Sequence, residues 1–282
     1  MMNLMHLVQS IASNLESVAI MAAIGVYLMI VEARAPIQAK MPAKDIIGEW
    51  VFTGITVGMA ALFEPLVMAC SGFIVNAAGG GLIKLRSDGL WYFASLFVIV
   101  IFMDLYKYWL HRLQHKIPLL WELHSFHHSS ESLIFITGAR HHWIERTMFA
   151  AFLPVIAIIF KVPSSIGITA AVIIFLPDTC AHTNVRLDLG RATAWINNPQ
   201  WHRIHHSARL EHRDKNFASF LTLWDFLFGT AWVPGTNEYP ETGLSLGEKV
   251  GLIEGIVWPF RKYLPRARVG AALDGIRPSE PA

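Results

Sequence analysis

The sequence predicts an all-α, polytopic integral membrane protein in which a helical bundle carries a histidine-rich helical cap. Hydrophobic residues fill 54% of the 282 positions and charged residues only 16%, whereas about a quarter of a soluble domain is charged. Long apolar runs alternate with short polar loops, and the run from Leu90 to Leu110 has about the 20 residues that a spanning helix needs. The net charge of +2 is too small to indicate a nucleic-acid partner.

The first part of the chain contains the helices expected to anchor it. Because the N-terminus lacks a basic leader, we expect no signal peptide before the first apolar run, Ser17 to Val31. The second run, Ile46 to Val75, is expected to kink at Pro65, because proline removes a backbone hydrogen bond from a helix. Gly79 to Gly81 predict a connecting loop. Residues 1–89 are therefore assigned to N-terminal transmembrane helices.

The second half contains a hairpin and a polar region. Thr147 to Phe160 and Ser165 to Pro177 are apolar but short for full spans, which favours a tight hairpin that dips only part-way into the membrane. Leu246 to Leu264 are amphipathic. We divide this half into a histidine-rich unit, residues 90–232, and a C-terminal amphipathic segment with a loose tail, residues 233–282. Cys70 and Cys180 lie in or beside apolar segments and predict neither a disulfide nor a thiolate metal site.

Three histidine boxes contain eight of the thirteen histidines: His-x-x-x-His from His111, His-x-x-His-His from His124, and His-x-x-His-His from His202. Residues i, i+3 and i+4 share one face of a helix, so each box presents its imidazoles in one direction. Imidazole is the commonest metal ligand and suits iron, copper, nickel and zinc. Eight imidazoles exceed what one ion binds, so the sequence predicts two ions. The candidate ligands are His111, His115, His124, His127, His128, His202, His205 and His206.

Other histidines and one carboxylate accompany the boxes. His182 follows the hairpin and is a candidate further ligand, whereas His6 and His212 are expected at the surface. Asp104 lies on the same helix face as His111 and His115, with 4-3-4 spacing through Tyr108. A carboxylate at membrane depth needs a partner. It either supports a ligand histidine through a hydrogen bond or pairs with Lys107 or Arg112.

The distribution of charge predicts the membrane face of the boxes. A hairpin crosses twice and returns the chain to the same side, so residues 111–142 and residues 182–212 share one face. Most of the arginines and lysines outside the apolar runs fall on that face as well. Basic loops face the cytoplasm. The boxes are therefore expected on the cytoplasmic face of a bacterial inner membrane or of the endoplasmic reticulum.

The boxes and their flanks resemble the fatty acid hydroxylase / sterol desaturase superfamily. The resemblance extends from about Leu90 to Thr230. It rests on D-L-Y-K-Y-W-L-H-R at Asp104 to Arg112, N-P-Q-W-H-R-I-H-H-S at Asn198 to Ser207, and D-K-N-F with L-W-D-F-L-F-G-T between Asp214 and Thr230. R-H-H-W-I-E at Arg140 to Glu145 resembles the R-x-H-x-x-E element of the family, and H-T-N-V-R at His182 to Arg186 resembles the segment with its extra histidine.

The resemblance implies a membrane-bound, non-haem di-iron enzyme that uses O₂ and two electrons to hydroxylate or desaturate a lipid C–H bond. The eight box histidines and His182 are then the iron ligands, and His142 is preferred to His141 as a further ligand or support, together with Glu145. Asn216 and Asp225 are expected to support the third box through hydrogen bonds. Asp178 stands where some relatives have another histidine or a glutamine. The sequence has no flavin, haem or nicotinamide motif, so electrons must come from a separate protein or a reduced cofactor.

Other interpretations remain open on the sequence. The boxes do not distinguish hydroxylation from desaturation, and they leave the lipid open: a sterol, fatty acid, sphingoid base, carotenoid or ether lipid. A membrane metal-binding or transport protein is a rival of another class, although its histidines should follow a path across the membrane. A catalytically silent relative that organises lipids is a third possibility, but it is expected to lose ligands that it no longer needs.

Overall fold

The computed structural model describes residues 23–34, 36–38, 41–187, 189–244, 250 and 252–263. Helices dominate this part of the chain, and its one strand pairing joins β1 (Ile83–Lys84) to β2 (Phe160–Lys161). The predicted all-α class is confirmed. Residues 1–22, with His6 and the start of the first apolar run, lie outside the described residues, whereas residues 23–34 are helical.

Within the described residues, three helices are long and apolar enough to cross a membrane: α2 (Ala43–Ala77), α3 (Gly89–Lys116) and α6 (Ser164–Ala181). Each contains a stretch of 18 residues that is strongly apolar, which is typical of helices that cross a membrane. In α2 only Phe52 and Thr56 are buried. This helix is continuous through Pro65, where the sequence predicts a kink.

The predicted hairpin is formed by α5 (Trp143–Ile159) and α6, which are joined through β2 and Pro163. Its tip pairs in parallel with β1, a contact that the sequence did not indicate. Gly81 makes this approach possible, because a Cβ there would lie 2.6 Å from the Cβ of Lys161. The backbone of Gly81 also has a φ of 72°, a conformation that favours glycine.

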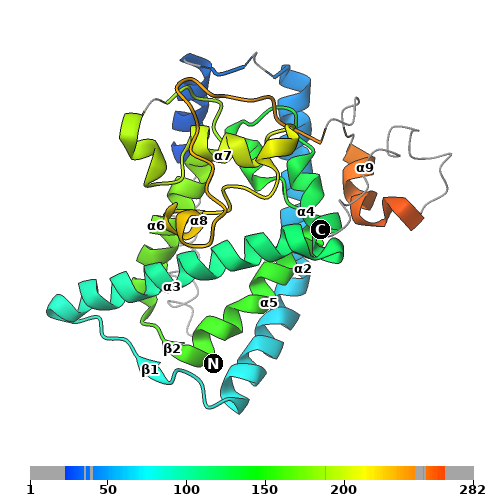
Figure 1. Ribbon diagram of the computed structural model, residues 1–282. Coiled ribbons are helices and arrows are strands. Elements are labelled where there is room, and N and C mark those ends of the chain that lie inside the picture. Colours follow the sequence, from blue (N-terminus) through cyan, green and yellow to red (C-terminus); the bar gives the residue numbers. More distant parts are fainter. Residues whose placement is uncertain are drawn as a thin grey trace.

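The long helices pack in pairs, with α2 beside α5 and α3 beside α6, and α3 passes obliquely under the cap (Figure 1). The apolar core between α3, α5 and α6 contains Ile99, Val100, Ile156, Phe160, Ile166, Ala170 and Ile174. This core fixes the C-terminal ends of α3 and α6 near each other. Both ends carry candidate ligands.

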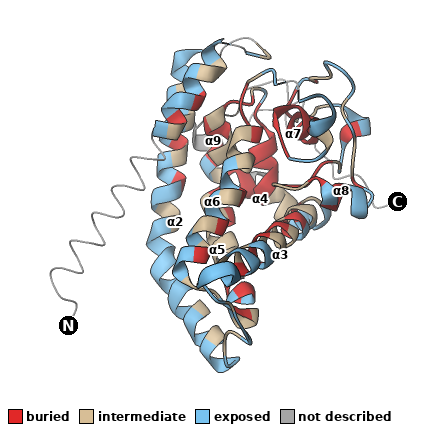
Figure 2. Ribbon diagram, turned by 90° about the vertical axis from the view of Figure 1, so that its left-hand side faces the viewer, coloured by how far each residue is buried: buried red, intermediate tan, exposed pale blue. Residues whose placement is uncertain are grey.

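The cap is built from short elements that lie over these ends. They are α4 (Pro118–His128), η1 (Phe135–Ala139), η2 (Gly190–Ala194), α7 (Pro199–His205), η3 (Leu210–His212), α8 (Leu223–Leu227), α9 (Leu252–Val257) and η4 (Trp258–Tyr263). Figure 2 shows that α4 and α7 are largely buried, whereas α2 is exposed along most of its length. Within the cap, η4 packs on α4, since Trp258 donates a hydrogen bond to Ser125 and packs against Phe126.

Candidate metal centre

Four elements present the candidate ligands: the C-terminal ends of α3, α4 and α6, and α7 with the residue that follows it. Proline at the first turn starts both short helices, Pro118 in α4 and Pro199 in α7. Asn198 also caps α7, because its side-chain oxygen accepts hydrogen bonds from the next two free backbone N–H groups, each at 3.1 Å. These local signals fix where α4 and α7, the helices that carry the second and third histidine boxes, begin.

The structure gathers all nine candidate ligands into two adjacent groups. The first group contains His111, His115, His124, His128 and His205, and the second contains His127, His182, His202 and His206. Within each group, one ligand atom per residue lies within 4.8 Å of all the others. The groups touch, since the rings of His128 and His206 stack with their centroids 4.3 Å apart.

The two His-x-x-His-His boxes divide between the groups in opposite ways. In α4, the i and i+4 residues His124 and His128 join the first group, whereas His127 joins the second. In α7, His202 and His206 join the second group, and His205 joins the first. Each of these helices therefore contributes to both groups, which holds the groups at a fixed separation.

Hydrogen bonds to Nδ1 determine which nitrogen of several imidazoles carries a lone pair. His111 donates from Nδ1 to the carbonyl of Phe217 at 2.9 Å, and His124 donates from Nδ1 to Glu145 at 2.8 Å. Both Nε2 atoms of the neutral rings then carry lone pairs, yet they lie 3.1 Å apart. Two lone pairs facing each other repel unless a cation lies between them.

The second group has a similar arrangement. His182 donates from Nδ1 to the carbonyl of Asp178 at 2.8 Å, and its Nε2 lies 3.1 Å from Nε2 of His127 and 3.0 Å from Nε2 of His202. Two nitrogens that bind one ion at right angles, each about 2.1 Å from it, lie about 3.0 Å apart. The spacing of the imidazoles in both groups fits a metal ion.

Burial keeps these imidazoles neutral and so available as ligands. Burial outweighs the opposing effect of Asp178 and, with a smaller contribution from His141, lowers the pKa of His182 to about 4. Burial, followed by the charges of neighbouring histidines, also holds the pKa of His127, His205 and His206 well below the usual value. Metal ions bind the neutral form of imidazole, so such pKa values favour metal binding at neutral pH.

A braced loop after α7 holds one histidine from each of two boxes. The carbonyl of Lys215 accepts a hydrogen bond from His205 Nδ1 at 2.8 Å, and that of Phe217 accepts one from His111. Asn216 and Asp225 fix this loop. Asn216 bonds to the backbone of Trp201 and Trp232, and Asp225 accepts from the N–H groups of Phe217 and Ala218, the indole of Trp201 and the hydroxyl of Thr230. Both residues support the site through the backbone.

Asp104 has a different role from either that the sequence suggested. Its carboxylate accepts hydrogen bonds from the backbone N–H groups of Phe220 and Leu221 and from the indole of Trp224. It contacts neither a candidate ligand nor Lys107 or Arg112 through a hydrogen bond in the described part of the chain. The helix-face argument placed Asp104 correctly on α3, but the segment leading into α8 packs there and supplies its donors.

His141, and not His142, lies at the candidate metal centre. The ring of His141 stacks on His127 at 4.3 Å, and its Nδ1 lies 3.1 Å from Glu145. His142 instead caps α5 by accepting a bond from Ile144 N–H, and it donates to the carbonyl of Ile256. The sequence preference for His142 is therefore corrected. The two neighbours point in different directions because His142 is the residue at which the helix begins.

Glu145 lies where the sequence expected a support. One of its oxygens accepts from Gln114 at 2.6 Å and from His124 at 2.8 Å, and His141 lies against the same oxygen. Although burial alone would favour the neutral carboxyl, the charges of His141 and His124 hold its pKa well below the usual value. Gln114 also lies on α3, so this carboxylate ties α3, α4 and α5 together at the first group.

The contacts also show the surroundings of Asp178 and revise the expectation for His212. Asp178 forms an ion pair with Lys107 at 3.1 Å through its side chain, and only its backbone carbonyl contacts a candidate ligand, His182. His212, which was expected at the surface, is buried against Trp232 and lies 3.5 Å from Glu238. It belongs to neither histidine group.

Two buried arginines near the boxes were not singled out from the sequence. Arg140 pairs with Glu49 of α2 at 3.2 Å and lies over the ring of Phe126. Arg203 donates to the carbonyl of Pro240 and to the side chain of Gln38. Each arginine links a histidine box to a distant segment. For Arg140 two signals were available: its place in the R-H-H-W-I-E element, and Glu49 in the second apolar run, since a buried carboxylate needs a cationic partner.

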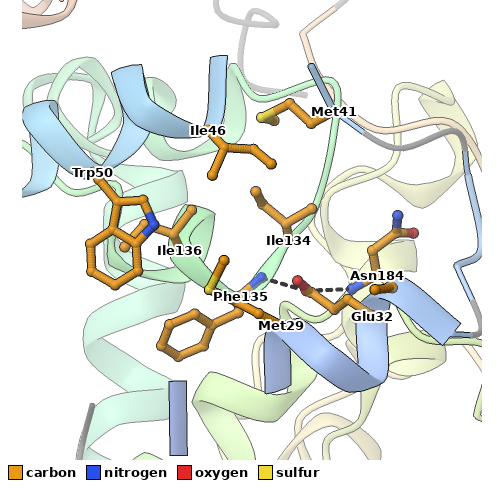
Figure 3. A pocket seen from close by; sticks show the side chains of 10 residues that line it. Met29, Glu32, Met41, Ile46, Trp50, Ile134, Phe135, Ile136 and Asn184 are labelled. Atoms are coloured by element: carbon orange, nitrogen blue, oxygen red, sulfur yellow. Dashed lines mark hydrogen bonds between the residues drawn. The ribbon is translucent and has the colours of Figure 1, made fainter. Parts of the chain in front are cut away.

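An apolar pocket of about 220 Å³ lies beside the cap, between residues 23–34, the start of α2 and η1 (Figure 3). Its apolar lining includes Met29, Met41, Ile46, Trp50, Ile134 and Ile136. At its edge, Glu32 accepts hydrogen bonds from the backbone N–H groups of Phe135 and Asn184. On η1, Gly138 packs against the ring of His182. The same short helix therefore contacts both the pocket and the second histidine group.

Comparisons with known proteins agree on one family. The model of the fatty acid hydroxylase family matches residues 96–230. Alkylglycerol monooxygenase of Danio rerio is 30% identical over 181 residues, which cover 63% of this chain and 40% of that protein. The human alkylglycerol monooxygenase is 32% identical over 149 residues, which cover 53% of this chain and 32% of that protein.

A bacterial relative is also similar. Ornithine lipid hydroxylase OlsE of Rhizobium tropici is 26% identical over 155 residues, which cover 55% of this chain and 47% of that protein. The chain thus spans less than half the length of these curated relatives. No solved structure gives a significant match.

Proposed function

The histidine-rich part of this chain, residues 96–230, belongs to the fatty acid hydroxylase family, and on this premise we propose that the protein is a membrane-bound, O₂-dependent lipid hydroxylase with two non-haem iron ions. Hydroxylation is preferred to desaturation because the alkylglycerol monooxygenases and the ornithine lipid hydroxylase carry names that describe the insertion of oxygen. The proposed substrate is a membrane lipid with a polar head and an alkyl or acyl chain.

One observation carries this proposal: the division of nine buried histidines into two touching groups. In the first group, the Nε2 lone pairs of His111 and His124 converge at a distance that fits a shared cation. Iron is favoured over zinc by the chemistry, since oxidation of an unactivated C–H bond requires a redox metal and O₂. The five residues of the first group and the four of the second are the proposed ligands.

The surrounding residues have defined tasks in this proposal. When bound, the iron pair supplies the oxidising chemistry. Glu145 orients His124, and the carbonyls of Phe217 and Lys215 orient His111 and His205. The buried walls of α4 and α7 exclude bulk water, which protects the lipid carbon and strengthens these hydrogen bonds. The protein thus supplies position and dryness to the metal pair.

The position of the site suits a lipid substrate. The ligands lie at the ends of α3 and α6, two of the helices that are long and apolar enough to cross a membrane. The apolar pocket beside η1 can accept part of a hydrocarbon chain next to the second group. We further propose that this site faces the cytoplasm and receives electrons from a separate protein or a reduced cofactor. Residues 90–232 would form the catalytic unit.

Metal analysis of the full chain, purified without oxygen in mild detergent, tests the proposal. We expect about two irons per chain, a clear loss with His205→Ala, and retention with His142→Ala, which removes a buried histidine outside both groups. Conversion of added alkyl or acyl lipids to hydroxylated products should then require both O₂ and reductant. Zinc-only protein without O₂-dependent product would contradict the oxygenase and favour a metal-binding role.

A further inference from the structure

A patch of large apolar side chains covers one flank of the cap, and all but one of its members lie outside the helices that could span a membrane. Its members are exposed, and they come from the end of α3, from the segment before α7, and from α8. They are Trp109, Trp195, Ile196, Leu223, Phe226 and Leu227. We call this set the apolar ledge.

Contacts show that the apolar ledge is one surface. Backbone pairing joins Ile196 to Leu221, directly before α8, and Thr222 donates to the carbonyl of Trp195. At the other end of α8, the ring of Phe228 lies 4.9 Å from that of Trp109. The ledge therefore runs from Trp195 across α8 to α3 without a break in contact.

The polarity of α8 is opposite to that of a helix on a water-soluble protein. Asp225 is fully buried and its carboxylate accepts four hydrogen bonds. In contrast, Leu223, Phe226 and Leu227 are 52%, 49% and 63% exposed. The neighbouring segment repeats this pattern, with Asn197 buried and Trp195 73% exposed. Contiguous exposed apolar patches of this kind are rare on soluble surfaces and mark sites of interaction.

We propose that the apolar ledge inserts into the lipid bilayer, so that the catalytic cap itself contacts the membrane. The ledge is continuous with α3, whose exposed residues Phe93 and Phe97 belong to a helix able to span a membrane. Tryptophan is enriched where protein meets the lipid headgroups. Two cations flank the ledge: the guanidinium of Arg112 lies 5.3 Å from the ring centre of Trp109, and exposed Arg191 precedes Trp195 by one helical turn. These charges suit lipid phosphates.

Membrane contact of the ledge has a consequence for the metal centre. The loop at 215–217 orients His205 and His111, and Asp225 of α8 holds that loop. Lipid packed against the outer face of α8 would therefore stabilise the inner face that supports the ligands. This inference concerns the surface and does not depend on the proposed reaction.

The test measures how deeply the ledge residues lie in the bilayer. Membrane attachment itself cannot serve as the readout, because the spanning helices would hold any variant in the membrane. In full-length protein with Cys70→Ser and Cys180→Ala, single cysteines replace Trp195, Leu223 or Leu227 and carry an environment-sensitive fluorophore. Leu210→Cys is the matched control, since Leu210 is 68% exposed but lies between the charged residues Arg209 and Glu211. The proteins are placed in nanodiscs of phosphatidylcholine and phosphatidylglycerol.

We expect lipids with a nitroxide on the acyl chain to quench the three ledge positions several-fold more than position 210, and aqueous iodide to show the reverse order. Equal quenching by iodide at ledge and control would overturn the proposal, because the ledge would then face water. Protection of the ledge from both quenchers would also overturn it and would indicate coverage by protein. Three ledge positions are used so that a folding defect in one variant does not decide the result.

Discussion

At the scale of single residues, the carboxylate of Glu145 connects three helices at one atom. Its Oε1 accepts from Gln114 of α3 and His124 of α4, and His141 lies 3.1 Å away. A hydrogen bond of this kind fixes the tautomer of a metal-binding histidine and raises its basicity. The side chain is thus placed to orient one proposed ligand.

Glu145→Gln tests this role. The amide retains one acceptor oxygen but brings two N–H donors toward groups that are themselves donors. We expect metal affinity to fall by roughly 10- to 100-fold, measured as iron retained against increasing chelator. Glu131→Gln, at an exposed carboxylate, is the control. Unchanged retention in Glu145→Gln would show that His124 is held without it.

Gly138 provides a second test at this scale, directed at the other group. A Cβ at this position would lie 2.9 Å from Cγ of His182 and 3.0 Å from its Nδ1. The ring has to move, which weakens its hydrogen bond to the carbonyl of Asp178. Gly138→Ala is therefore expected to reduce iron content by about half, with loss from the second group. Gly167→Ala, where the nearest atom lies at 3.7 Å, should retain full iron content.

At the scale of elements, the segment from Asp214 to Leu227 positions two of the candidate ligands. Its two polar anchors, Asp225 within it and Asp104 on α3, accept seven hydrogen bonds between them from the described residues. Backbone carbonyls of the same segment orient His111 and His205. Much of this segment has no regular secondary structure. Hydrogen bonds from its backbone N–H groups to the two carboxylates replace the backbone hydrogen bonds of a helix or sheet.

Asp225→Asn should weaken the hydrogen bonds that hold this segment in place. One carboxylate oxygen becomes an amide nitrogen, which cannot accept from the donors that face it. Each buried donor left without a partner costs about 1–3 kcal/mol. We expect a lower thermal midpoint of unfolding and loss of iron, followed together in one temperature series. Glu241→Gln, at an exposed position, should change neither quantity. A destabilised variant with full iron content would contradict a role of this segment in ligand orientation.

At the scale of the whole molecule, the buried histidines couple stability to pH in the metal-free protein. Burial lowers the pKa of His182 from 6.5 to about 4, and the same cause acts on His127, His202 and His206. At a pH between the pKa of a histidine in the unfolded chain and its lower pKa in the folded chain, the unfolded chain binds more protons than the folded chain. Stability therefore rises with pH in this window and falls on acidification.

The expected result is a thermal midpoint of the metal-free protein in detergent that falls as the pH is lowered from 6.5 to about 5, above the range in which most carboxyl groups titrate. Replacing His127 and His206 by Gln should reduce this slope, because two of the shifted groups are removed. A flat profile in the unaltered protein would show that the histidine groups are already open to water.

The sequence was most informative where chemistry follows from spacing within one element. His202, His205 and His206 lie within about one helical turn, so their common direction follows from helix geometry alone. The apolar runs at α2 and α3 were recognisable by length and composition for the same reason, whereas the run at α6 was judged short for a full span although the helix is long and apolar enough to cross a membrane. The nine candidate ligands named from the boxes and His182 are the nine that the structure gathers.

Spacing could not determine which atoms meet across elements. The division of each box between two groups, the inward direction of His141, and the donors around Asp104 depend on the angles at which α3, α4, α5 and α7 pack. The prediction for Asp104 was wrong because its partners are backbone N–H groups, which every residue carries and no sequence pattern marks.

The sequence by itself determined a helical membrane chain and a set of histidines with a common direction on each helix, because helix periodicity and apolar length are local properties. Only the tertiary structure decided that the boxes form two touching groups, that Glu145 and the 215–217 carbonyls orient them, and that α8 exposes its apolar side. Those features arise from contacts between segments up to about a hundred residues apart, and packing alone brings such segments together.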